Sequence, residues 1–215
     1  MLQKKYELKS ICSLTDNFNV SYKHDFIDKY KANKYYDLLE QNLIYNTAEE
    51  SKVVVFGKEY LIARKQVSYG EAGTFYSFAG TTVYSKDWNT NDIVCRIIKN
   101  IKHKVEVFTG KKFNFVLINR YANGNDKIMA HRDNENGLDK EAPIAGVSLG
   151  AVRDVCFVPY KFIPNKLAKR ITIELEHGSI FVMNTPTNTY WTHEIPQRSN
   201  VHSPRISLTF RNLII

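Results

Sequence analysis

The chain has 215 residues and a mass of 24.9 kDa, a size that suits one domain. Its composition of 43% hydrophobic and 24% charged residues is that of a globular protein and excludes an intrinsically disordered one. The 30 lysines and arginines exceed the 22 aspartates and glutamates, which gives a formal net charge of +8. That excess favours an anionic partner such as nucleic acid, although a basic protein without such a partner has the same composition.

The sequence shows no signal for secretion or for a membrane. No apolar stretch reaches the length of a membrane span, and the N-terminal residues do not resemble a signal peptide. Cys12, Cys95 and Cys156 lack the spacing of a metal site, so we expect reduced thiols in an intracellular protein. No apolar stripe argues for self-association, and we expect a monomer.

Two helices are predicted in the first half of the chain. Residues 1–20 carry little signal, and we expect them to be a flexible extension of a single domain that spans residues 1–215. Residues 25–42 place apolar side chains at helical intervals, either in one helix or in two short ones. Residues 91–105 have the pattern of a second, amphipathic helix that is capped by Thr90 or Asn91.

Short β-type runs make up the rest of the pattern. Residues 52–56 and 60–62 flank Gly57-Lys58-Glu59, which predicts a hairpin. Further strands are predicted at residues 113–121, 144–149, 155–159, 170–175, 179–183 and 206–210. The series predicts an α+β, β-rich fold in which helices come first and an antiparallel sandwich or jelly roll follows. Such a β-core is a common container for metal sites.

His131-Arg132-Asp133 is the sharpest local feature of the sequence. On an extended segment residues i and i+2 project to the same side, so His131 and Asp133 can bind one ion. His193 offers a second imidazole further along the chain. Two histidines and one carboxylate leave one face of an octahedral metal ion open, as in non-haem Fe(II) oxygenases. Taken alone, the motif also fits a surface turn or a zinc site.

Residues 205–211 alternate polar and apolar side chains. A strand here places Ile206, Leu208 and Phe210 on one face and Arg205, Ser207, Thr209 and Arg211 on the other. If the polar face points into the β-core, its arginines need an anionic partner, which a bound dicarboxylate would supply. Taken alone, the segment also fits a solvated face beside a phosphate backbone.

The combined pattern resembles the AlkB family of Fe(II)/2-oxoglutarate-dependent dioxygenases. The resemblance rests on His131-x-Asp133, on His193 and on the Arg205/Arg211 pair near the end of the chain. Three longer segments, at residues 63–66, 113–121 and 183–189, carry it more specifically, and it extends from about residue 53 to the last residue. Within the family it is closest to members that act on double-stranded DNA.

The resemblance implies a double-stranded β-helix (jelly roll) core and a set of cofactor-binding residues. His131, Asp133 and His193 would bind Fe(II). The positions that match residues holding the co-substrate 2-oxoglutarate are Asn119, Tyr121, Arg205, Thr209 and Arg211, of which Arg211 would pair with the distal carboxylate. In the implied reaction O2 converts 2-oxoglutarate to succinate and CO2 and hydroxylates the N-methyl carbon of the lesion, which then leaves as formaldehyde; ascorbate can assist it in vitro.

The implied substrate is DNA that carries N-alkyl lesions such as 1-methyladenine and 3-methylcytosine. The protein would then be nuclear if its source is eukaryotic. The enzyme has to extrude the damaged base from the duplex. Phe56 lies at the hairpin turn where family members carry an intercalating finger, so the hairpin is expected to bind DNA with Phe56 as the wedge. The alternative is that Phe56 folds back into the core.

The resemblance also implies a pocket for the extruded base. Phe78 would stack on one face of the base and the ring of His131 on the other, with Tyr76 bonding to the base or to a phosphate and Glu135 joining the substrate-binding set. The alternative for both aromatic residues is ordinary core packing. Candidates for phosphate contacts are Arg64, Lys65, Lys166, Lys169 and Arg170, each of which also fits a solvated charge.

Two residues depart from the family pattern. Asn134 and Ala79 replace more polar residues near the pocket, which leaves the base preference open. The remaining histidines, His24, His103, His177 and His202, lack partners at ligand spacing, and we expect them to be structural.

Three other functions compete with repair of duplex DNA. The first is the same chemistry on RNA or single-stranded DNA, against which Phe56 argues because a wedge has little use on an unstacked strand. The second is a zinc hydrolase or deaminase, although the chain lacks the His-x-Glu and Cys-x-x-Cys elements of zinc deaminases. The third is a non-catalytic, basic nucleic-acid-binding module, which leaves His193 and the Arg205/Arg211 pair unexplained.

Overall fold

The computed structural model describes residues 9–13, 17–55, 57–78, 81–135, 137–160 and 168–214. The helices in these ranges are α1 (Lys29–Asn42), α2 (Ile93–Thr109), the short α3 (Thr187–Tyr190) and a 3-10 turn (Glu49–Ser51). None of the helices in the described ranges is long and apolar enough to cross a membrane.

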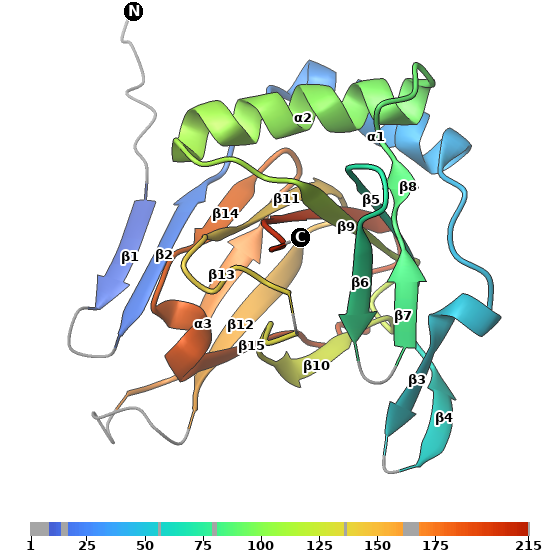
Figure 1. The fold of residues 1–215 in the computed structure, drawn as a ribbon. Coiled ribbons are helices and arrows are strands. Elements are labelled where there is room, and N and C mark those ends of the chain that lie inside the picture. The colour runs from blue at the N-terminus through green and yellow to red at the C-terminus, as the bar shows by residue number, and fades with distance from the viewer. Residues whose placement is uncertain are drawn as a thin grey trace, which may run out of the picture.

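Two sheets lie face to face, with α1 and α2 covering the outer side of the larger one (Figure 1). The larger sheet has the strand order β1-β2-β14-β11-β16-β9-β5-β8. Its strands are β1 (Lys9–Ser13), β2 (Phe18–Lys23), β5 (Lys65–Gly70), β8 (Lys86–Asp87), β9 (Phe115–Tyr121), β11 (Ile144–Gly150), β14 (Ile180–Met183) and β16 (Arg205–Arg211). All its neighbours are antiparallel except β5 and β8.

The smaller sheet has the order β10-β15-β12-β13 and carries part of the site. Its strands are β10 (Ile128–His131), β12 (Arg153–Pro159), β13 (Ile171–Leu175) and β15 (Trp191–Ile195). Two hairpins project beside the sheets, β3 (Lys52–Val55) with β4 (Lys58–Leu61) and β6 (Phe75–Phe78) with β7 (Thr81–Tyr84) (Figure 1).

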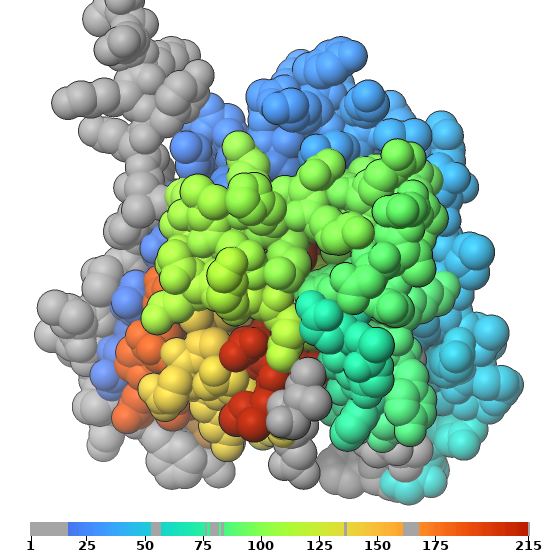
Figure 2. Space-filling view, turned by 45° about the horizontal axis from the view of Figure 1, so that its top comes forward, coloured from blue at the N-terminus to red at the C-terminus, as the bar shows by residue number. Residues whose placement is uncertain are grey.

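Two apolar clusters hold the layers together, one on each face of the larger sheet. Strand β9 shows the division, because Val116 and Ile118 pack in the helix-side cluster while Phe115, Leu117 and Tyr121 pack between the sheets. Amphipathic α2 supplies much of the helix-side cluster and lies over the middle of that face (Figure 2). A strand that is buried on both faces fixes its register firmly, since a slip by one residue would exchange the two faces.

Strand β16 places its two kinds of side chain as its alternation predicts. Ile206, Leu208 and Phe210 pack toward the helices, whereas Arg205 and Arg211 point between the sheets and are only 1% and 4% exposed. The polar face of this strand is therefore the interior one, and the alternative of a solvated face is wrong.

Both predicted helices form, with shifted starts. Helix α1 begins at Lys29 instead of residue 25, because the side chain of Asp28 caps it by accepting a hydrogen bond from the Lys31 amide. Helix α2 begins after Asp92, which accepts from the Cys95 amide, so Asp92 and not Thr90 or Asn91 is its cap. It ends at Gly110, whose positive φ of 67° suits glycine.

The expected order of helices first and strands second is wrong. Strands β1 and β2 precede α1, and β3 to β8 lie between α1 and α2. Within the segment expected to be flexible, Lys9–Ser13 pairs with β2, and Phe18 and Val20 are buried. The six strands predicted after residue 113 form at β9, β11, β12, β13, β14 and β16, and the hairpin forms as β3 and β4.

Candidate functional site

Two histidines meet across neighbouring strands of the smaller sheet. His131 ends β10, and His193 lies opposite it in β15. Their ring centroids are 4.3 Å apart. Asp133 follows the end of β10, and its Oδ1 lies 3.4 Å from Nε2 of His131 and 3.9 Å from Nε2 of His193. One ligand atom from each of the three residues lies within 4.8 Å of the others, as a shared metal ion requires.

The protonation of the three side chains suits metal binding. Nδ1 of His131 lies 2.8 Å from the carbonyl oxygen of Met129, so the proton resides on Nδ1 and Nε2 is left as a ligand. Burial and the nearby His131 lower the pKa of His193 to about 3, so its ring is neutral near pH 7. Burial alone would raise the pKa of Asp133, but Arg211 and the two histidines hold it well below its usual value.

The donor set fits a divalent metal ion with open coordination positions. Asp133 is 1% exposed, and its Oδ1 makes no hydrogen bond of standard geometry with any described residue. A buried carboxylate oxygen without a donor is costly, and a metal ion would satisfy it. Two imidazoles and one carboxylate form the ligand set of Fe(II) oxygenases, although the set alone would also accept zinc.

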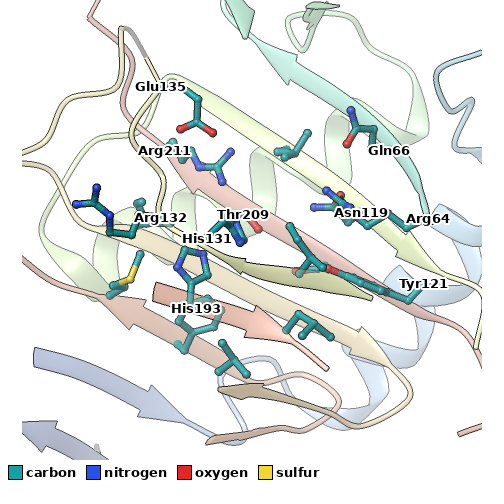
Figure 3. Close-up of a pocket in the computed structure, with 18 of the residues that line it drawn as sticks. Arg64, Gln66, Asn119, Tyr121, His131, Arg132, Glu135, His193, Thr209 and Arg211 are labelled. Atoms are coloured by element: carbon teal, nitrogen blue, oxygen red, sulfur yellow. The ribbon is translucent and has the colours of Figure 1, made fainter. Parts of the chain in front are cut away.

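Arg211 forms an ion pair with Asp133. Its Nη2 and Nε lie 2.7 and 3.1 Å from Oδ2 of Asp133, and Figure 3 places it beside Glu135 at the cavity wall. The guanidinium therefore lies at the metal end of the site. The expectation that Arg211 pairs with the distal carboxylate of 2-oxoglutarate does not agree with this position.

Arg205 has the environment that was expected of Arg211. Its guanidinium carbon lies 5.3 Å from the centroid of the Tyr121 ring, and Nη2 donates to Oγ of Ser148 at 2.8 Å. Nε and Nη1 are buried without a hydrogen-bond partner among the described residues. Burial lowers the pKa of Arg205 to about 10, so it is still a cation at neutral pH. A buried cation with two open donors is suited to a carboxylate ligand.

A cavity of about 320 Å³ joins these groups (Figure 3). Its lining includes the predicted residues His131, His193, Asn119, Tyr121, Arg205, Thr209, Arg211, Arg64 and Glu135. Asp133 borders a second cavity of about 240 Å³, which is also lined by residues of α3. The structure thus brings the predicted iron-binding and co-substrate residues to one place.

The structure describes only some of the residues that were predicted to contact DNA. Phe56, Ala79 and Lys166 lie outside the described residues, and of Tyr76 and Phe78 only the backbone, in β6, is described. Arg64 lies in the cavity wall, where its Nε donates to Oδ1 of Asn119 at 2.7 Å, an arrangement that differs from an exposed phosphate contact.

The other basic candidates lie on the surface. Lys65 and Lys169 are exposed, and Arg170 pairs with Glu194 at 2.8 Å. Among the histidines expected to be structural, His24 lies near Asp25, His103 and His202 are exposed, and Nδ1 of His177 accepts a hydrogen bond from the Gly150 amide.

Gln66 and Arg132 also line the cavity and were not predicted as site residues. Gln66 is buried and reaches the cavity from β5. Arg132 stacks on Tyr160 with 4.3 Å between the guanidinium carbon and the ring centroid. Both residues lie next to residues that were singled out, but nothing in the local sequence indicates which way a polar side chain of a strand or turn points.

Comparison with known proteins identifies the type of site. The family model "2OG-Fe(II) oxygenase superfamily" matches residues 19–211. DNA oxidative demethylase ALKBH2 of Mus musculus is 42% identical over 190 residues, which cover 86% of this chain and 77% of that protein. ALKBH2 of Homo sapiens is 40% identical over 190 residues, which cover 87% of this chain and 70% of that protein. The Homo sapiens alpha-ketoglutarate-dependent dioxygenase alkB homolog 3 is 32% identical over 123 residues, which cover 54% of this chain and 42% of that protein.

Solved structures share the fold at low sequence identity. The structure of OsALKBH1 has a TM-score of 0.54 and 14% identity and covers 90% of this chain and 96% of its own. A prolyl hydroxylase of Trichoplax adhaerens, in complex with a peptide of hypoxia inducible factor, has a TM-score of 0.58 and 10% identity. The match covers 91% of this chain and 83% of that chain. The predicted jelly-roll core is confirmed. With the family match over most of its length, the chain belongs to the AlkB family of the 2OG-Fe(II) oxygenase superfamily and is a dioxygenase that uses Fe(II), 2-oxoglutarate and O2.

Proposed function

We propose that this dioxygenase is a DNA oxidative demethylase that removes N-alkyl groups from damaged bases. The observation that carries the proposal is the His131, Asp133 and His193 cluster at a cavity with a buried cation at its other end, in a chain 40–42% identical to DNA oxidative demethylases. The net charge of +8 suits a polyanionic substrate.

In this proposal 2-oxoglutarate lies along the cavity between the metal and Arg205. Arg205 binds the distal carboxylate with its two open donors, beside Tyr121. Arg211 neutralises Asp133 and stabilises the end of the co-substrate nearest the metal. Asn119 and Thr209 line the space between the two ends. This assignment gives the distal carboxylate to Arg205, whereas the resemblance implied Arg211 for it.

When bound, the metal, 2-oxoglutarate and O2 would together supply hydroxylation of the N-methyl carbon, with 2-oxoglutarate converted to succinate and CO2. That carbon would then leave as formaldehyde, which restores the base. The residues of the chain bind the metal and the co-substrate, orient the base toward them and exclude water from the cavity. His193 stays neutral and Asp133 ionised, so both are ready as ligands near pH 7. The proposal requires no protein nucleophile and no general base.

The proposed substrate is 1-methyladenine or 3-methylcytosine in duplex DNA. Extrusion of the base costs a few kcal/mol, less for a base that already pairs badly. We propose that Phe56, between β3 and β4, fills the gap, while Phe78, Tyr76 and Glu135 contact the extruded base. Glu135 lines the cavity next to Arg211, which supports a role at its mouth. We also propose that the protein acts as a monomer, which light scattering of the purified protein tests.

The test is mass spectrometry of defined oligonucleotides that carry one lesion. Duplexes and matched single strands are incubated with purified protein, Fe(II), ascorbate and 2-oxoglutarate. We expect loss of one methyl group that requires 2-oxoglutarate, is absent in His131→Ala and persists in His103→Ala, whose histidine is exposed on α2. No loss of methyl from either lesion, in protein shown to bind iron, would overturn the proposed substrate but leave the dioxygenase class standing.

The same assay separates duplex DNA from single strands and RNA. If Phe56 is a wedge, Phe56→Ala should lower activity on the duplex and leave activity on the single strand unchanged. Tyr60→Ala removes an exposed aromatic residue from β4 of the same hairpin and serves as the matched control. Preference for single strands or RNA in the wild type, unaffected by Phe56→Ala, would favour the competing substrates.

A further inference from the structure

Among the described residues, no strand pairs with the backbone at Asp133. His131 is the last residue of β10 and is paired with His193 in β15, so both imidazoles are held within a sheet. Residues 132–135 belong to no helix or strand. The carboxylate ligand therefore needs another means of support, because a shift of the backbone here would move Oδ1 away from the histidines.

The side chain of Asn188 supplies that support. Its Oδ1 accepts a hydrogen bond from the Asp133 amide at 3.0 Å, and its Nδ2 donates to the Asp133 carbonyl oxygen. The carboxamide thus bonds both backbone groups of one residue, as a partner residue does in a hydrogen-bonded pair of an antiparallel sheet. The carboxamide of Asn188 therefore makes the two backbone hydrogen bonds that a neighbouring strand would make at Asp133.

Asn188 is itself held in place. It lies in α3, where the buried hydroxyl of Thr187 accepts from the Asn19 amide at 2.7 Å and donates to the Asn19 carbonyl at 3.0 Å. Asn19 belongs to β2 of the larger sheet. In addition, Arg132 donates to the carbonyl oxygen of Thr189 at 3.1 Å. The turn that carries Asn188 is therefore bonded both to the larger sheet and to the side chain of Arg132 and the backbone of Asp133.

We propose that Asn188 is a positioning residue for the metal centre, acting through the backbone of Asp133 without contacting the ion. Arg211 fixes one carboxylate oxygen of Asp133, and Asn188 fixes the main chain that carries the carboxylate. Together they aim Oδ1 at the two imidazoles. The inference depends on the metal site and is independent of which alkylated nucleic acid is the substrate.

The test measures metal affinity and not turnover. Mn(II) is titrated into the full chain with 2-oxoglutarate present, for the wild type, Asn188→Ala and Asn184→Ala. Asn184 bonds the same turn to Asn19 and Ser21, and none of the hydrogen bonds of the described residues joins it to Asp133, so it is the matched control. Loss of a group that orients a metal ligand typically weakens metal binding about 10–100-fold. We expect a loss in that range for Asn188→Ala and less than about twofold for Asn184→Ala.

Melting temperatures without and with Mn(II) separate positioning from general stability. A merely structural role lowers both temperatures equally, whereas a positioning role reduces the rise that the metal produces. If Asn188→Ala does not fold, Asn188→Asp takes its place, since it keeps the size and the acceptor oxygen but loses the donor to the Asp133 carbonyl. Wild-type Mn(II) affinity in Asn188→Ala or in its substitute, or an equal loss in Asn184→Ala, would overturn the proposal.

Discussion

Arg205 and Arg211 lie on the same face of one strand but differ in what surrounds them. Arg211 has an anionic partner in the protein itself, the carboxylate of Asp133. Arg205 has only neutral partners among the described residues, the hydroxyls of Ser148 and Ser207 and the ring of Tyr121. The energetic need for a bound carboxylate is therefore concentrated on Arg205, since an unpaired buried charge is costly.

We expect Arg205→Ala to raise the KM for 2-oxoglutarate at least about 30-fold, because breaking a buried charge pair costs roughly 2 kcal/mol or more. Metal binding without co-substrate should be retained. Arg211→Ala should weaken metal binding as well, because Asp133 loses the bonds that hold its Oδ2. Steady-state kinetics with varied 2-oxoglutarate and a separate Mn(II) titration measure the two effects. Equal behaviour of the two variants would contradict this division of roles.

Arg64 bonds to Asn119 in the cavity wall. If its bond to Asn119 supports the co-substrate, Arg64→Ala should raise the KM for 2-oxoglutarate by up to about tenfold, the range for loss of one hydrogen bond. If Arg64 instead contacts a phosphate, the salt dependence of DNA binding should fall by about one unit in the log–log slope. Kinetics and binding at several salt concentrations decide between the two, with Arg96→Ala, a change of an exposed residue on α2, as the comparison.

Most strands that are long buried runs were predicted, but β5, which is buried from Gln66 to Gly70, was missed, as were β1, β2, β6, β7, β8, β10 and β15. Strands β9, β11 and β14 are almost wholly buried and read as apolar runs. Strands β10 and β15 were missed because they turn polar or exposed residues toward the cavity and solvent, as in Trp191–Ile195 with His193 at its centre. The strands that carry the metal ligands therefore lack the periodicity by which strands are recognised.

The site could be predicted as a set of residues but not as a set of contacts. Spacing and resemblance brought together His131, Asp133 and His193, which the structure places within reach of one ion. The ion pair between Asp133 and Arg211 depends on how the segment after β10 meets β16, two parts of the chain that share no local pattern. For the same reason the sequence did not indicate that Arg211 pairs with Asp133 while Arg205 keeps two open donors.

The turn between β13 and β14 should make the free energy of unfolding depend on pH. Nδ1 of His177 accepts a hydrogen bond from the Gly150 amide at 2.8 Å. Burial and Lys29 lower the pKa of His177 below 6.5, with Asp37 opposing them. The unfolded chain then binds the proton more readily, so this contribution is complete above about pH 6.5 and is lost as the pH falls through the folded value.

We expect the free energy of unfolding of the metal-free protein to decrease between about pH 7.5 and about pH 5.5, and to decrease less in His177→Phe. His193 acts in the same direction, because its pKa is lowered to about 3, so the slope should be reduced and not abolished. Urea denaturation at several pH values measures the slope. An unchanged slope in His177→Phe would show that protonation of this residue does not matter for stability.

For the whole molecule, metal and co-substrate should act as stabilising ligands. They bind the folded chain at residues that only the fold brings together, on β9, β10, β15 and β16. At a concentration 100 times its Kd, a ligand adds about 2.7 kcal/mol, which for a protein of this size raises Tm by roughly 5–11 °C. Differential scanning fluorimetry with Mn(II) and 2-oxoglutarate measures the rise, and Asp133→Ala should abolish it. A rise in that variant would place the binding elsewhere.

The place of β16 in the larger sheet has a consequence for biosynthesis. This strand lies between β11 and β9, near the middle of the order, although it is formed by residues 205–211. A growing chain therefore cannot complete the sheet, the cavity or the Asp133 pair until synthesis has passed Arg211. Until then the inner edges of β9 and β11 are open to other strands, the kind of exposure that chaperones protect. Nascent chains stopped before residue 205 should remain sensitive to protease throughout, and those released after residue 211 should acquire protection in a single step.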